Sequence, residues 1–452
     1  MDRAESGTLS ETARALAEGK TSSRKLLEQA LARIEEPSGE GRRAFIRVYR
    51  ESAREAADAS DRLRARGIVP SPLAGVPASI KDLFDVAGEV TLAGSRVRAD
   101  AAPAREEAVV VRRLRAAGAI FVGRTNMSEF AFSGLGINPH YGTPRSPWDR
   151  KTGRAPGGSS SGAAVSVADA MCVIGLGSDT GGSVRIPAAF CELVGFKPTV
   201  GRIPTNGAFP LSKTLDSIGP IARSVACCAL VDAILAGEPP QVPAALPLPG
   251  LRLGVVREFV LDRLDAQVSR SYASALSRLS AAGARLSDIP FSELIEIPDI
   301  NARGTISNAE VYALQRDLIS RRVKDYDPRI ASRILEGANM LASDYVELLW
   351  RRGELIRRAR LSMEPFDALI WPTVAVEPPK IAPLESEDEI YVRTDGAVLR
   401  NTSVVNFIGG CALSIPCHAR GEAPVGVMLV GPPGADRHIL QAGLALEPVA
   451  RI

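Results

Sequence analysis

The amino-terminal part of the chain carries apolar residues at helical spacing. From Leu9 onward they recur every three or four positions, and the same spacing returns over residues 26–34. Between these stretches Thr21 or Ser22 is placed to cap the second helix. The pattern predicts that residues 8–67 form an outer layer of helices.

After residue 72, short apolar runs typical of strands alternate with helical patterns. The apolar runs cover residues 76–84, 119–122 and 173–176, and the helical patterns cover 106–117 and 162–171. This alternation is typical of a sheet with helices on both faces. We therefore predict an α/β fold with a single large mixed β-sheet sandwiched by helices.

The middle of the chain is mainly helical in pattern. A proline-rich connector at 239–249 leads to one strand-like run at 251–256, and helical patterns follow at 264–282, 305–323 and 341–363. This part could form a separate domain or a cap over the sheet. Strand-like runs return at 368–371, 412–415 and 425–430, before a helix near 436–449. Because strands return so late, we predict one domain over 1–452, with a variable helical region at about 250–365.

Composition excludes several classes of function. The 452 residues are 45% hydrophobic and 24% charged, with a net charge of only +3, so binding to nucleic acid is not expected. Six cysteines without CxxC spacing indicate buried, reduced thiols. No uncharged apolar stretch of membrane-spanning length occurs, and the amino terminus lacks the apolar core of a signal peptide. We expect a cytoplasmic protein with no membrane contact.

The most informative polar segment is a glycine-rich loop around Ser183. It follows an apolar run, reads GSDTGGSVR, and precedes Pro187, which suits the start of a helix. Glycines allow successive backbone N–H groups to turn toward one point, as an oxyanion requires. An isolated GGS would more often be a turn whose serine caps the next helix.

Two further residues can work with this loop. Ser159 lies 24 positions earlier in PGGSSSG, directly before a helix of small residues. Lys81 lies in the apolar run LAGVPASIKDLF, where burial would favour the neutral amine and allow it to act as a base. A charged, structural Lys81 paired with Asp82 or Asp85 is an equally good interpretation of the residues alone.

Three motifs, in this order, resemble those of the amidase signature family. GVPASIKD is similar to its lysine segment, GGSSSG to its middle-serine segment, and GSDTGGSVRIPAAFCELVGFKPTVGRIP to its nucleophile segment, with the family's spacing between the serines. The resemblance is dense over a core of about 70–225. Weaker matches, FDALIWPTV, NFIGGCALSIP and PVGVMLVGP, extend it toward the carboxyl end.

The resemblance implies a cofactor-free enzyme, without a metal, that works through an acyl-enzyme. It implies that Ser183 is the nucleophile, that Ser159, after a cis peptide bond, relays its proton, and that Lys81 is the terminal base. The oxyanion N–H groups implied by the family are those of Thr180, Gly181, Gly182 and Ser183. From the residues, we add the hypothesis that Asp179 and Arg185 pair to brace the loop.

Two other serine-enzyme patterns occur. GSSSG matches GxSxG, which would make Ser160 the nucleophile of an α/β-hydrolase with His418 or His438 as partner. SSRK at Ser22 and KTG at 151–153 match two of the three penicillin-recognising motifs, but SDN is missing between them, so we interpret this match as chance.

The resemblance leaves two functions open. The first is a free-standing amidase that hydrolyses a small carboxamide to an acid and ammonia. The second is the transamidating A subunit of a glutamyl-tRNA amidotransferase. Such subunits usually have glutamine before Pro187, where this chain has Ile186, and this favours the amidase. Met127, Phe132 and Tyr141 lie in a segment similar to one that borders the family's active site, and the resemblance makes a homodimer plausible.

Overall fold

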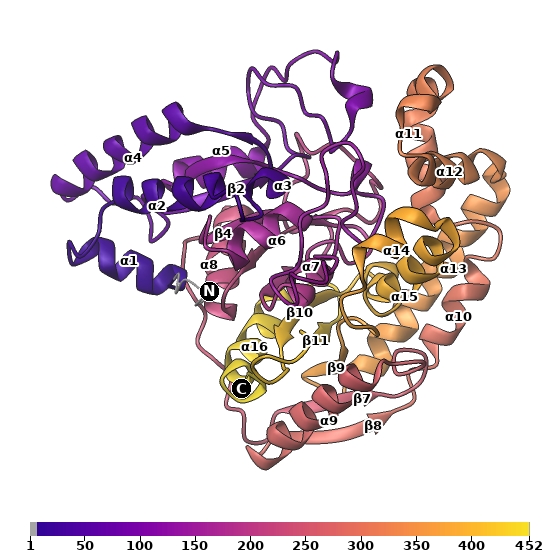
Figure 1. Ribbon diagram of the computed structural model, residues 1–452. Helices are drawn as coiled ribbons and strands as arrows, with labels where there is room; N and C mark the ends of the chain where they lie inside the picture. Colours follow the sequence, from indigo (N-terminus) through magenta and orange to yellow (C-terminus); the bar gives the residue numbers. More distant parts are fainter. Residues whose placement is uncertain (1–6, 452) are drawn as a thin grey trace.

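One continuous sheet runs through the molecule. The computed structural model describes residues 7–451, and in that range eleven strands pair in the order β1-β3-β2-β4-β6-β5-β10-β11-β9-β7-β8 (Figure 1). The strands are β1 (Phe45–Val48), β2 (Pro77–Lys81), β3 (Ile120–Thr125), β4 (Ile174–Asp179), β5 (Val194–Lys197), β6 (Ser217–Ala222), β7 (Arg252–Val256), β8 (Arg285–Ile289), β9 (Ala368–Pro372), β10 (Cys411–Pro416) and β11 (Gly426–Gly431). Parallel pairs lie on both sides of an antiparallel centre, and β1 adds an antiparallel pair at one edge, so the predicted single mixed sheet is confirmed.

Helices cover this sheet. They are α1 (Leu9–Ala17), α2 (Ser23–Glu35), α3 (Gly41–Ala44), α4 (Arg50–Ala65), α5 (Val109–Ala116), α6 (Ser161–Ala168), α7 (Arg185–Phe190), α8 (Val225–Ala236), α9 (Ala266–Ala281), α10 (Glu293–Ile300), α11 (Ile306–Arg322), α12 (Pro328–Glu336), α13 (Ala342–Met363), α14 (Ile381–Ser386), α15 (Asp388–Phe407) and α16 (Asp436–Ala450). Figure 1 shows α1, α2 and α4 at one end of the molecule and α10 to α13 at the other. None of the helices within residues 7–451 has both the length and the apolar composition of a membrane span.

Two expectations about the elements need correction. The predicted all-helical stretch at 8–67 is interrupted by β1, which pairs antiparallel with β3 at the edge of the sheet. The region at about 250–365 is mainly helical as predicted, but it also contributes β8, whose exposed, polar sequence RLSDI carries no strand pattern. In both places pairing with a neighbouring strand outweighs the local pattern.

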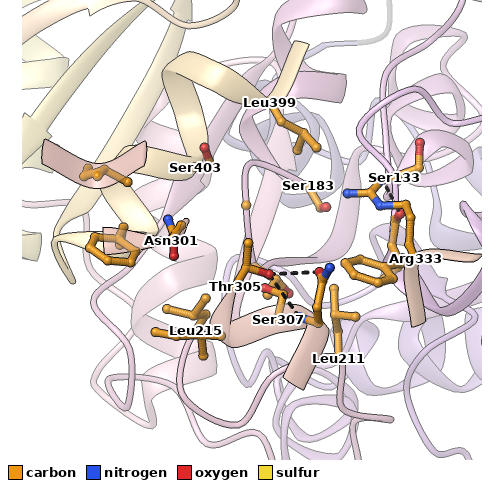
Figure 2. Close-up of a pocket in the computed structure, with 18 residues that line it drawn as sticks. Ser133, Ser183, Leu211, Leu215, Asn301, Thr305, Ser307, Arg333, Leu399 and Ser403 are labelled. Atoms are coloured by element: carbon orange, nitrogen blue, oxygen red, sulfur yellow. Dashed lines mark hydrogen bonds between the residues drawn. The ribbon is translucent and has the colours of Figure 1, made fainter. Parts of the chain in front are cut away.

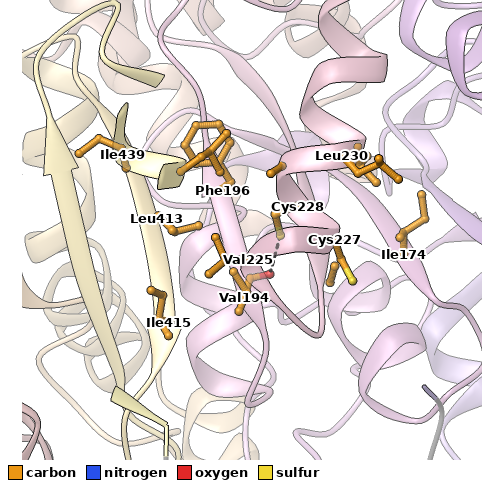
Figure 3. Close-up of a cluster of buried hydrophobic side chains, with 14 of the residues drawn as sticks. Ile174, Val194, Phe196, Val225, Cys227, Cys228, Leu230, Leu413, Ile415 and Ile439 are labelled. Carbon is orange, nitrogen blue, oxygen red and sulfur yellow. Dashed lines mark hydrogen bonds between the residues drawn. The ribbon is translucent and has the colours of Figure 1, made fainter. Parts of the chain in front are cut away.

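The largest core cluster lies between the central strands and the helices α8 and α16. Figure 3 shows Val194, Leu413 and Ile439 in the same cluster as Val225 and Cys228 of α8, and the Cys228 thiol lies 3.5 Å from the Val194 carbonyl oxygen. All six cysteines are free and buried, which confirms the expectation of reduced, buried thiols. This packing fixes the central strands against each other.

The sheet places two chain segments side by side at one edge. β2 and β4 are parallel, and Ile80 lies opposite Leu176 in the pairing. Because parallel strands end at the same edge of a sheet, Lys81 at the end of β2 lies beside Ser178 and Asp179 at the end of β4. The glycine-rich loop of Ser183 starts from this point.

Candidate active site

Lys81 lies in the interior, among serine hydroxyls. Its Nζ is 2.7 Å from Ser159 Oγ and 2.8 Å from Ser178 Oγ, and the whole residue is inaccessible to solvent. Burial lowers the pKa of Lys81 to about 7, although the negative charges of Asp179 and Asp216 oppose the shift. The amine is therefore neutral in a large part of the molecules near neutral pH and able to accept a proton.

The alternative pairing of Lys81 with Asp82 or Asp85 is not found. Asp82 is bound instead by the buried guanidinium of Arg124, with Nε 2.7 Å from the carboxylate, and Asp85 accepts a hydrogen bond from Thr91. Within residues 7–451 no carboxylate lies in ion-pair range of Lys81.

The two serine segments meet at this edge of the sheet. The Ser160 N–H donates to the Ser183 carbonyl oxygen over 3.3 Å, and the peptide bond that precedes Ser159 is cis, as the resemblance implied. Ser159 is fully buried beside Lys81, whereas Ser183 is 4% exposed and lines a cavity. Of the three side chains, Ser183 alone lines the cavity, and Ser159 and Lys81 lie in the interior.

A buried ion pair braces the loop that carries Ser183. Asp179 and Arg185 contact each other at 2.9 Å with no exposure of either side chain, which confirms the hypothesis that they pair. Asp179 also accepts the N–H groups of Gly182 and Val184, and Asn406 donates to it. Despite burial, Arg185 holds the pKa of Asp179 well below its usual range, so the carboxylate stays charged.

These bonds decide which N–H groups of the loop remain unpaired. The Gly182 N–H donates to Asp179 Oδ1 over 2.8 Å and is therefore occupied. The N–H groups of Thr180, Gly181 and Ser183 make no hydrogen bond to any group in residues 7–451. Thr180 is in turn fixed by its hydroxyl, which donates to the partly buried carboxylate of Asp216. The loop thus presents unpaired donors beside the Ser183 hydroxyl, the arrangement that an oxyanion needs.

The cavity in front of Ser183 has a volume of about 220 Å³, at the small end of ligand pockets. Figure 2 shows Ser183 between Leu399 and Ser403 on one side and Leu211 and Leu215 on the other. The lining residues are Ala131, Phe132, Ser133, Thr180, Gly181, Ser183, Leu211, Leu215, Ile297, Asn301, Thr305, Ile306, Ser307, Asn308, Arg333, Leu399, Ser403 and Phe407.

The three residues expected near the substrate lie in different places. Phe132 lines the cavity. Met127 is fully buried in an apolar cluster with Phe130, and Tyr141 is only half-buried. Neither Met127 nor Tyr141 is part of the cavity wall.

The competing serine-enzyme patterns are not supported by the geometry. Ser160 Oγ is buried and contacts the Ser178 carbonyl oxygen. The His418 ring bonds to the backbone of Val425, and His438 lies near Asp367. Ser22 caps helix α2 by accepting the Lys25 N–H. Neither histidine contacts Ser160, so no α/β-hydrolase triad forms within the described residues.

Sequence reasoning missed three residues that shape the site. Ser178 is in the nucleophile motif, and its position one strand away from Lys81 could have been found from parallel pairing of the two runs. Asp216 and Arg333 carry no local signal, because they reach the site only through loops and helices far along the chain.

Comparisons with known proteins place the whole chain in one enzyme family. The family model described as Amidase matches residues 25–440. The chain is 37% identical to a 2-amino-5-chloromuconic acid deaminase of Comamonas testosteroni, over 87% of this chain and 86% of that protein. It is also 35% identical to the A subunit of a glutamyl-tRNA(Gln) amidotransferase of Moorella thermoacetica, over 89% of this chain and 88% of that protein.

A third relative and a solved structure extend the match over nearly the whole chain. A 1-carboxybiuret hydrolase subunit of Pseudomonas sp. (strain ADP) is 34% identical, with 96% of each chain covered. A crystal structure of an amidase is 33% identical, superposes with a TM-score of 0.88, and covers 98% of this chain and 99% of its own.

Proposed function

We propose that this chain, a member of the amidase family, hydrolyses a small carboxamide to an acid and ammonia. Enzymes of this family cleave C–N amide bonds. Ser183 is the nucleophile in this proposal, and Ser159 and Lys81 together remove its proton. The groups come from the core at 70–225, which also carries the three motifs.

The reaction proceeds through an ester of Ser183. Ser183 Oγ attacks the amide carbon, its proton passes to Ser159, and the Ser159 proton passes to Lys81 Nζ. The unpaired N–H groups of Gly181 and Ser183 stabilise the oxyanion that forms. The proton returns by the same route to the departing nitrogen, which leaves as ammonia. Water then attacks the ester and releases the acid and free Ser183.

The contact between Lys81 and Ser159 is the observation that carries this proposal. A neutral amine has a lone pair, and at 2.7 Å it can take the hydroxyl proton directly. Because neither residue lines the cavity, solvent does not compete for that proton.

The size of the cavity favours a small primary amide. A volume of about 220 Å³ leaves little room for a long chain on the leaving nitrogen. A panel of primary, secondary and long-chain amides, assayed for ammonia or amine release, tests this preference. Activity on long-chain or secondary amides alone would refute it.

The similarity to the A subunits of glutamyl-tRNA(Gln) amidotransferases supports a second candidate, a transamidating subunit. The two candidates differ in what the isolated chain does. A free-standing amidase turns over its amide alone, whereas a transamidating subunit needs partner chains to pass the ammonia on. We expect the purified chain to release ammonia, and we expect the rate to stay the same when partner subunits of an amidotransferase are added.

Labelling identifies the nucleophile. A fluorophosphonate should add one group to the chain, and peptide mapping should place it on Ser183. Ser183→Ala should abolish labelling and lower turnover at least about 1,000-fold. An adduct on Ser160 or Ser22 would overturn the assignment.

A further inference from the structure

A second cavity borders helix α15, the helix that also forms part of the wall in front of Ser183. It has a volume of about 530 Å³, within the range of ligand sites, and lies between α15 and the segment that joins β7 to α9. The α15 residues in its wall recur three or four positions apart, so they share one face of the helix. Leu399 and Ser403 lie on an adjoining face and line the first cavity. Within residues 7–451 the two cavities have no lining residue in common.

The wall of this second cavity carries three guanidinium groups without carboxylate partners. They belong to Arg263, Arg393 and Arg400, and Asp262 is the one acidic residue in the wall among the residues that the structure describes. Arg263 and Arg393 are exposed and make no hydrogen bond or ion pair with any group in that part of the chain. With three positive charges against one negative charge, the wall has a net charge of +2.

Arg400 shows the lack of a partner most clearly. Its side chain is partly buried, and Nε donates to the neutral Asn401 Oδ1 over 3.1 Å. Nη2 is enclosed and has no hydrogen-bond partner anywhere from residue 7 to residue 451. Burial lowers the pKa of Arg400, the negative charge of Asp262 opposes this shift, and the positive charge of Arg263 adds to it. An enclosed charged donor without an acceptor is unfavourable, and an anion beside the guanidinium would offset part of that cost.

The segment opposite α15 has a fixed and strained backbone. Phe259 and Arg263 have φ values of 66° and 48°, in the left-handed region that side chains other than glycine disfavour. Asn401 of α15 holds this segment, because its Nδ2 donates to the Val260 carbonyl oxygen over 2.9 Å. Strained residues of this kind persist where the surrounding structure holds them, and they are frequent at ligand sites. The two walls are therefore joined, and the cavity is formed before any ligand arrives.

We propose that this cavity binds a small organic anion with at least two negative charges, a polycarboxylate or a phosphate ester. The guanidinium groups of Arg263, Arg393 and Arg400 bind the oxygens of the anion, since planar guanidinium groups match carboxylate and phosphate oxygens. Phe259 and Ala397 contact its hydrocarbon part. Two charges on the ligand balance the net charge of the wall. The site is separate from Ser183, so the inference does not depend on the proposed amidase function.

Calorimetric titration with three probes tests the site and the class of its ligand. Citrate or pyrophosphate should bind once per chain and at least about 10-fold more tightly than acetate, because acetate can engage fewer of the arginines. Tighter binding of citrate would identify the ligand as a polycarboxylate, and tighter binding of pyrophosphate would identify it as a phosphate ester. No saturable binding of either probe, or an affinity equal to that for acetate, would overturn the proposal.

Substitutions in the wall then assign the effect. Arg400→Met should weaken binding about 10- to 100-fold, and the exposed Arg393→Met, which leaves the core untouched, should weaken it about 2- to 5-fold. Asp262→Asn should tighten binding, because it removes the negative charge. Arg360→Met is the matched control: Arg360 is an exposed arginine of α13 outside the cavity. Unchanged affinity in both cavity variants, or the same loss in Arg360→Met, would contradict the inference.

A last variant separates the two cavities. Arg333 lines the cavity in front of Ser183 and is the other arginine that an anion near α15 could reach. Arg333→Met should bind citrate and pyrophosphate as the wild type does. Loss of binding in Arg333→Met, with wild-type affinity in Arg400→Met, would place the anion in the first cavity and refute the second site.

Discussion

Two buried lysines of this protein share an environment and differ in their neighbours. Lys81 and Lys197 are both inaccessible to solvent, and burial lowers the pKa of the first to about 7 and of the second to about 8. The amine of Lys81 contacts two serine hydroxyls, whereas that of Lys197 contacts the carbonyl oxygens of Pro198 and Gly410.

In the proposed mechanism, this difference in neighbours decides which buried amine acts as a base. A carbonyl oxygen has no proton to give, so Lys197 can only fix the ends of β5 and β10. In our proposal the Ser159 hydroxyl gives its proton to Lys81 and takes another from Ser183. Desolvation is common to both lysines, and the proposal assigns proton transfer to the one whose amine contacts a hydroxyl.

The largest expected effect comes from replacing each lysine. Lys81→Met should lower kcat/KM about 100- to 10,000-fold, the usual contribution of a general base. Lys197→Met should change it less than about 10-fold in the folded protein, a barrier change below about 1.4 kcal/mol. Steady-state kinetics on both variants, with circular dichroism to check folding, measures this. Similar losses in both would show that burial alone accounts for the effect.

The next largest effect should come from disturbing the conformation of the glycine-rich loop that carries Ser183. Gly182 has φ +135°, and a Cβ there would lie 2.2 Å from Thr402 Oγ1, whereas a Cβ on Gly181 would meet nothing closer than Leu399 at 3.6 Å. Gly182→Ala should therefore slow fluorophosphonate labelling of Ser183 roughly 5- to 150-fold, as expected for strain of about 1–3 kcal/mol. Gly181→Ala is the matched control and should slow it less. The reverse order would show that room in the cavity matters more than the loop.

A smaller effect should come from the charge near Lys81. The Asp216 carboxylate raises the pKa of Lys81 against the larger effect of burial, so Asp216→Asn should lower that pKa further and move the rise of kcat/KM to lower pH. Asp232→Asn is the control. Burial raises the pKa of both Asp216 and Asp232 to about 6, but Asp232 pairs with Arg202 and does not affect the pKa of Lys81. A pH profile that moves upward in Asp216→Asn, or moves equally in both, would contradict this.

A last effect, read in the unfolding equilibrium and not in a rate, is on stability. Both lysines have folded-state pKa values far below the ordinary 10.5, so between these values the unfolded chain binds a proton that the folded chain does not. The free energy of unfolding of the wild type, relative to that of the methionine variant, should therefore rise with pH. For Lys81 the rise should begin at about pH 7, for Lys197 at about pH 8, and both should end at about pH 10.5. Urea unfolding of each pair across this range measures the difference in free energy of unfolding. A difference that stays constant with pH would show that the amines remain charged in the fold.

The residues proposed for catalysis were predicted from the sequence more fully than the residues that surround the cavity. The strand ending at Lys81 and the two serine loops each carry a local motif, and the parallel pairing of β2 and β4 brings them together. Arg333 and Asp216 have no such motif. Their positions depend on how α12 and the loop after β5 pack on the sheet, which is set by contacts between residues far apart in the chain.

The fold shows the same division. Several strands buried on both faces, such as β2, β10 and β11, appear as apolar runs and were predicted within a few residues. The central strands β5 and β6 are equally buried but were not predicted. The edge strands β1 and β8 are partly exposed, and their sequences do not alternate clearly, so only pairing identifies them.

The pH dependence of Ser183 labelling with a fluorophosphonate tests the proposal that a neutral Lys81 activates Ser183 through Ser159. We expect the labelling rate to rise with an apparent pKa of about 7, the pKa that burial gives Lys81, and we expect Lys81→Met to abolish this rise and Lys197→Met to retain it. A rise with an apparent pKa near the ordinary 10.5 of lysine, or the same profile in Lys81→Met, would contradict it.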